Sequence, residues 1–140
     1  MDSINFPTTT DKELRLKAIA AEHINIVQAI AQLQNDLSFS TSSANNLYAT
    51  LKGCHAIFVS LHGFARTSVV EKLSQEDKEL IENFRKINFN SLLISDKSKP
   101  YSGKLSSVKN TAIIKQTAMD FIVLFDKYQD ALHQAGLAGL

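Results

Sequence analysis

The chain has 140 residues, of which 44% are hydrophobic and 21% charged, and this is enough for one domain with a buried core. The apolar fraction is too high for an intrinsically disordered chain, and five Gly and two Pro are too few for a collagen-like or linker-like one. A net charge of +1 excludes the strong overall field that marks many nucleic-acid and membrane binders. Any electrostatic function must therefore be local.

The signals for cellular compartment indicate the cytoplasm. Cys54 is the single cysteine, so no disulfide can form within the chain. The first ten residues have neither the positive region nor the apolar region of a signal peptide. No run of residues is apolar enough to span a bilayer. We therefore expect a cytoplasmic protein.

Residues 1–9 are predicted to form a flexible arm, and residues 10–140 a single helical domain. Thr10 and Glu13 have the spacing of a capping box, which predicts that the first helix starts there. Its apolar stripe, with steps of three and four, is Ile19, His23, Ile26, Ile30, Leu33 and Leu37. A Ser/Thr-rich connection at 38–43 precedes the second helix. The stripe of that helix is the most regular in the chain: Leu47, Leu51, Cys54, Phe58, Leu61 and Ala65.

Two more helices are predicted in the second half of the chain. Ser74 and Asp77 predict a helix start, and the stripe of this third helix is Leu80, Phe84, Ile87, Ser91 and Ile94. Residues 95–107 are predicted to form the longest loop. The fourth helix has the stripe Ile114, Ala118, Phe121, Phe125, Tyr128 and Leu132, and ends before Gly136. Four helices of roughly 20 to 29 residues with mostly short connections predict an all-α fold, an antiparallel up-down-up-down four-helix bundle.

Charged residues are distributed unevenly along the chain. Residues 1–22 hold seven of them and residues 66–140 hold twenty, whereas residues 23–65 hold only Asp36 and Lys52. A helix in a bundle normally carries Glu and Lys on its solvated face. In residues 23–65, uncharged residues must therefore occupy the positions that would normally carry Glu and Lys.

Two rows of uncharged residues occupy the positions where charges are missing. Opposite the apolar stripe, the first helix carries the amides Asn25, Gln28, Gln32 and Asn35. The second helix carries a row of small residues about 200° from its stripe: Ala49, Gly53, Ala56, Ser60 and Gly63. Small residues let another backbone approach closely, and packing offsets the cost of Gly within a helix.

These rows predict an association surface on the hairpin of the first two helices. The simplest form is a two-fold homodimer, in which the protein is a non-enzymatic interaction or assembly subunit. The alternative interpretation of the rows is a central helix with irregular packing in a monomer, beside a solvated face that is poor in charge.

A second hypothesis concerns the predicted loop before the fourth helix. It contains four lysines and one aromatic residue that could contact phosphates and stack on a base: Lys97, Lys99, Tyr101, Lys104 and Lys109. The alternative function is therefore a nucleic-acid-associated accessory protein. Four lysines without arginine are also typical of an ordinary solvated loop.

No motif predicts a catalytic residue, a metal site or a cofactor, so we expect no enzymatic activity. His55 and His62 are seven residues apart on one helix, which is too far for them to share one metal ion. Cys54 lies within the apolar stripe, and we expect a buried, unreactive thiol. His23 also lies in a stripe, as a core or boundary histidine; the alternative is a switch that makes assembly depend on pH.

Residues 49–53, Ala-Thr-Leu-Lys-Gly, resemble the His-x-Leu-Lys-Gly core of histidine phosphotransfer domains, which are also helical bundles. Ala49 stands where the resemblance implies the phosphorylated histidine. Alanine cannot accept a phosphoryl group, so no phosphorelay role is carried over to this chain.

Overall fold

A computed structural model describes residues 11–38, 44–89 and 111–137 of the chain. Its four α-helices in these ranges are α1 (Asp11–Ser38), α2 (Ala44–Val69), α3 (Gln75–Arg85) and α4 (Thr111–Gln134), and a short 3-10 helix, η1 (Val70–Lys72), follows α2. The predicted all-α class is confirmed for these residues. The predicted arm, residues 1–9, lies outside them. None of the described helices is long and apolar enough to cross a membrane.

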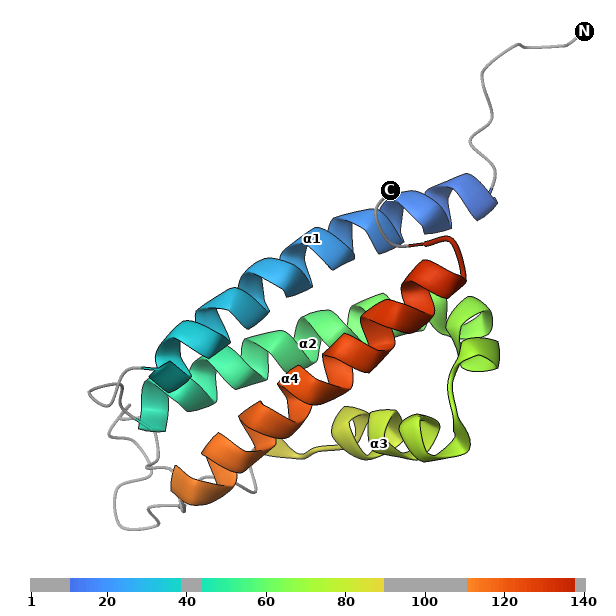
Figure 1. Ribbon diagram of the computed structural model, residues 1–140. Helices are drawn as coiled ribbons and strands as arrows, with labels where there is room; N and C mark the ends of the chain where they lie inside the picture. Colours follow the sequence, from blue (N-terminus) through green and yellow to red (C-terminus); the bar gives the residue numbers. More distant parts are fainter. Residues whose placement is uncertain (1–10, 39–43, 90–110, 138–140) are drawn as a thin grey trace, which may run out of the picture.

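α2 is the central element of the fold. It packs most extensively against α1 and also contacts α4, η1 and α3, while α1 and α4 contact each other less. Figure 1 shows the three long helices side by side, with the shorter α3 beside α4. This arrangement places the core along the side of α2 that faces α1, α3 and α4.

The stripes predicted for α1, α2 and α4 form most of the core, because three-and-four spacing keeps their side chains on one side of each helix. All stripe residues of α2 and α4 are buried. In α1, Ile19, Ile26, Ile30 and Leu33 are buried, whereas His23 and Leu37 are half-buried. An aromatic cluster fills the space between α2, α3 and α4, and it consists of Phe58, Phe84, Phe121 and Tyr128.

The start of α3 and the end of α4 have clear local causes. The Ser74 hydroxyl accepts a hydrogen bond from the backbone N–H of Asp77 at 3.1 Å, which confirms the predicted N-cap of α3. Beyond α4, Gly136 has a φ of +74°, and the Leu137 N–H donates to the Leu132 carbonyl at 2.8 Å. This is a Schellman cap, so the helix ends before Gly136 as predicted.

α3 is shorter than the sequence predicted. It has 11 residues and ends at Arg85, and Ile87 lies beyond it rather than within it. Side chains of α2 explain this end. His55 Nε2 lies 3.0 Å from the Arg85 carbonyl, and the Tyr48 hydroxyl donates to the Phe89 carbonyl at 3.0 Å.

The stripe predicted for α3 is also partly wrong. Leu80 is exposed, and Ile81 is buried in its place beside Phe84. Ser91, Ile94 and the predicted loop at 95–107 lie outside the described residues.

Candidate interaction surface

The two uncharged rows are exposed in the structure. All four amides of the α1 row and all five small residues of the α2 row are exposed. Each row lies on the side of its helix that is turned away from the core, so together they cover the outer side of the α1/α2 hairpin. We call this surface the hairpin face, defined by Asn25, Gln28, Gln32, Asn35, Ala49, Gly53, Ala56, Ser60 and Gly63.

Polar contacts hold the two helices of the hairpin together beside this face. The Asp36 carboxylate accepts hydrogen bonds from the Thr50 hydroxyl at 2.7 Å and from the Gln32 amide at 2.9 Å. Near the other end, the Arg15 guanidinium donates to the Thr67 hydroxyl at 3.2 Å. Asp36, one of the two charged residues in 23–65, therefore has its hydrogen-bond partners within the hairpin.

The glycines of the hairpin face are not required by packing within the described chain. A Cβ added at Gly53 or at Gly63 would meet no heavy atom within 4 Å. The described elements therefore leave this side of α2 uncovered. Any covering layer must come from outside these residues.

The structure does not test the five residues of the alternative nucleic-acid hypothesis. They lie outside the described part of the chain, and they are Lys97, Lys99, Tyr101, Lys104 and Lys109.

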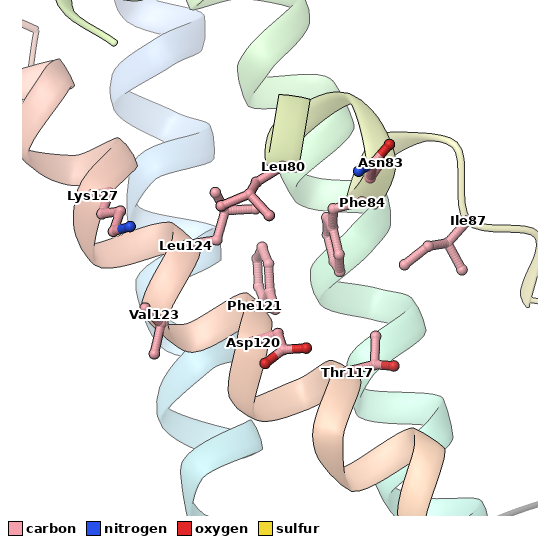
Figure 2. Close-up of a pocket in the computed structure, with 10 residues that line it drawn as sticks. All are labelled: Leu80, Asn83, Phe84, Ile87, Thr117, Asp120, Phe121, Val123, Leu124 and Lys127. Carbon is pink, nitrogen blue, oxygen red and sulfur yellow. The ribbon is translucent and has the colours of Figure 1, made fainter. Parts of the chain in front are cut away.

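A groove between α3 and α4 was not predicted. It has a volume of about 510 Å³, and Figure 2 shows the side chains of Leu80, Phe84, Phe121 and Leu124 directed toward one another between the two helices. The Phe84 and Phe121 rings stack with centroids 4.3 Å apart. Val123 is exposed at one edge of the groove. The groove is lined by α3 and by Ile87 just beyond it on one side, and by α4 on the other.

A buried polar pair connects α2 with α4. His62 Nδ1 lies 2.8 Å from the Tyr128 hydroxyl, and the His62 ring stacks on Phe58 with centroids 6.0 Å apart. His62 is only 5% exposed and Tyr128 is fully buried. The spacing of the histidines along α2 did not predict this pair. The sequence signal for this pair would have been a polar side chain on the core-facing side of each of the two helices.

Burial determines the ionisation of this pair. It lowers the pKa of His62, an effect that Glu82 opposes and that Arg66 and Arg85 reinforce. Burial also raises the pKa of Tyr128 above its ordinary value. Both groups are therefore neutral near pH 7.

The other histidine of α2 and its cysteine are structural. His55 packs against Phe84 and Phe89 with centroids 5.2 and 4.8 Å away. Cys54 is buried, and burial raises the pKa of its thiol to about 12, so a thiolate does not form near neutral pH. Among the described residues, no group of three His, Cys, Asp or Glu side chains is placed to hold a metal ion.

His23 lies at the boundary between α1 and α4. Its ring stacks on Phe125 with centroids 6.5 Å apart, and its Nε2 lies 3.5 Å from the amide nitrogen of Gln129. Burial lowers the pKa of His23, and the nearby His133 lowers it further.

These two histidines predict that stability falls in mild acid. The unfolded chain protonates a histidine near pH 6.5, whereas the folded chain keeps His23 and His62 neutral to a lower pH. The unfolded state therefore binds more protons as the pH falls below about 6.5, and the free energy of unfolding decreases there. Urea denaturation at pH 7.5 and 5.5 measures this, and His23→Gln should flatten part of the dependence. An equal midpoint at both pH values would contradict the prediction.

Comparison with protein-family models, with curated proteins and with solved structures finds no match to this chain. A function must therefore be inferred from the helical fold and its surfaces.

Proposed function

We propose that this protein is a non-enzymatic assembly subunit that binds another protein through the hairpin face, most simply a second copy of itself. The observation that carries the proposal is that a large accessible surface, formed by two long helices, has almost no charge. Protein surfaces normally carry about 25–35% Lys, Arg, Glu and Asp. The centres of protein interfaces are depleted in charge.

The remaining charges support this interpretation. The Asp36 carboxylate is already bonded to Gln32 and Thr50. Lys52 is then the other charged residue in the 23–65 segment, and it is exposed. A partner covering the hairpin face would therefore bury mainly amides and small side chains, whose desolvation costs less than that of ions, with Lys52 at the edge one helical turn from Ala49 and Ala56.

The glycines give the surface a shape that suits a close partner. Each Gly within a helix costs about 1 kcal/mol relative to Ala, and no contact within the described chain offsets this at Gly53 or Gly63. The backbone of a partner helix could approach closely at these positions. Exposed Phe64 on α2, and Ile24 and Val27 on α1, would add apolar area at the edges.

We further propose an antiparallel up-down-up-down bundle and a cytoplasmic location. The order of colours along the helices in Figure 1 supports alternating directions. The single cysteine, which is buried and unable to form a disulfide within the chain, supports a reducing compartment.

Ser60→Arg tests the interface directly. We expect the wild-type chain to have about twice its 15.5 kDa mass at high micromolar concentration. The variant should associate at least about tenfold more weakly, because it places an unpaired charge in the centre of the contact. Light scattering after size-exclusion chromatography measures the mass, and sedimentation equilibrium gives the dissociation constant.

Gln134→Arg is the matched control, since it places the same side chain at an exposed position of α4, away from the hairpin face. Both variants should unfold like the wild type at concentrations where the wild type is a monomer. A wild-type monomer at high micromolar concentration would exclude self-association. Equal weakening by both variants would exclude the hairpin face as the interface.

A further inference from the structure

A small pocket lies where the end of α2, η1 and α3 meet. It has a volume of about 140 Å³ and three aliphatic side chains in its wall. Its polar lining consists of His62 and Arg66 from α2 and of Lys78 and Glu82 from α3. The pocket is distinct from the hairpin face, because His62 belongs to the core side of α2.

The hydrogen bond of His62 determines what the imidazole offers to this pocket. The Tyr128 hydroxyl is fully buried, and His62 Nδ1 is its hydrogen-bond partner among the described residues. A buried hydroxyl needs an acceptor for its hydrogen, so we assign the bond as Tyr128 O–H donating to Nδ1. The neutral ring then carries its own hydrogen on Nε2.

We infer that the Nε2 edge of His62 faces this pocket. Tyr128, which holds the Nδ1 edge, does not line the pocket, whereas His62 does. Nε2 has no hydrogen-bond partner among the described residues. His62 thus lines the cavity while only 5% exposed, and Nε2 is the ring nitrogen that its bond to Tyr128 leaves unbonded.

The charged groups of the pocket favour an anion. Glu82 is bound by Arg85, whose Nη2 lies 2.8 Å from the Glu82 carboxylate, so its charge is already compensated. Arg66 and Lys78 have no ion pair within the described chain. A ligand in the pocket would therefore meet three donors, a guanidinium, an ammonium and an imidazole N–H, beside the Glu82 carboxylate that Arg85 already binds.

We propose that this pocket binds a single tetrahedral oxyanion of the phosphate class, held by His62 Nε2, Arg66 and Lys78. Three donors from two helices suit a tetrahedral ion, and Arg and Lys are the usual phosphate ligands in proteins. The volume is well below the roughly 300–1,000 Å³ of pockets for larger ligands, so it suits a single phosphate group.

The test is a titration of the full chain with inorganic phosphate at constant ionic strength. Imidazole ¹⁵N resonances report on His62 directly, and calorimetry gives the dissociation constant. We expect saturable binding that shifts the Nε2 resonance of His62. Arg66→Gln and Lys78→Gln should each weaken binding about tenfold or more, since each removes a charged donor. Neither side chain is part of the core, so both variants should fold.

Lys72→Gln is the matched control, because it removes an exposed lysine of η1 that does not line the pocket. It should leave binding within about twofold of the wild type, since it changes only screened, longer-range charge. Acetate should bind more weakly than phosphate. O-phosphoserine distinguishes the two sources of the anion: tighter binding than phosphate indicates a phosphate carried by a larger molecule, and equal binding indicates free phosphate.

Three results would overturn the proposal. The first is phosphate binding that does not saturate at tens of millimolar. The second is a His62 Nε2 resonance that does not shift when phosphate is added. The third is phosphate binding that Lys72→Gln and Arg66→Gln weaken equally.

Discussion

Phe58→Ala is expected to destabilise the fold by about 3–5 kcal/mol, a large share of the stability of a domain of this size. Phe58 is fully buried, and its ring contacts side chains of α2, α3 and α4. The ring centroids of Tyr128, Phe121 and Phe84 lie 4.9, 5.6 and 5.8 Å from it. Truncation therefore opens a cavity at the point where these helices meet. Urea denaturation followed by circular dichroism measures the loss.

Phe64→Ala is the matched control on the same helix. Phe64 is 41% exposed, so its truncation opens no enclosed cavity and should cost less than about 1 kcal/mol. Both variants should be measured at a concentration where the wild type is a monomer, because Phe64 borders the hairpin face. Equal losses would mean that the aromatic cluster is not the centre of the core.

The sequence predicts the core of the long helices well, because the information is local. A helical side chain that recurs every three or four residues returns to the same face whatever the rest of the chain does. Cys54 and Ala65 are buried with the larger members of the α2 stripe for this reason. The N-cap at Ser74 is likewise predictable, because its partner Asp77 is only three residues away.

The end of α3 could not be predicted, because residues far away in sequence determine it. His55 and Tyr48 bind carbonyls that lie 30 and 41 residues further along the chain. The local apolar pattern continues past Arg85, and these tertiary contacts are not encoded in it. The groove between α3 and α4 also depends on how two helices distant in sequence are placed, so it could not be predicted either.

The two candidate sites also differ in whether local or long-range sequence information determines them. The hairpin face depends on composition along two consecutive helices, so its nine residues can be found from the sequence. The structure adds that they are accessible and that nothing within the described chain packs on Gly53 or Gly63. The phosphate pocket depends on His62 and Tyr128, which are 66 residues apart, and on which ring nitrogen of His62 remains free. The pattern of residues along the sequence shows neither the contact between these side chains nor the free ring nitrogen.

Tyr128→Phe is expected to destabilise the protein by about 1–3 kcal/mol, although it removes a single oxygen. The hydroxyl is the partner of His62 Nδ1 at 2.8 Å, and both side chains are buried. Without the hydroxyl, a ring nitrogen is left unpaired in an environment that excludes water. The cost is mainly the desolvation of that nitrogen and not the loss of one hydrogen bond.

A double-mutant cycle separates this cost from a change in packing. His62→Leu removes the other partner, and the double variant leaves no unpaired polar atom of the pair. The double variant should therefore lose less stability than the sum of the two single variants, by about 0.5–3 kcal/mol in urea denaturation at pH 7.5. Additive losses would show that the contact contributes no coupling. His62→Leu should also remove part of the acid sensitivity, since a histidine with a lowered pKa is no longer present to be protonated in the unfolded chain.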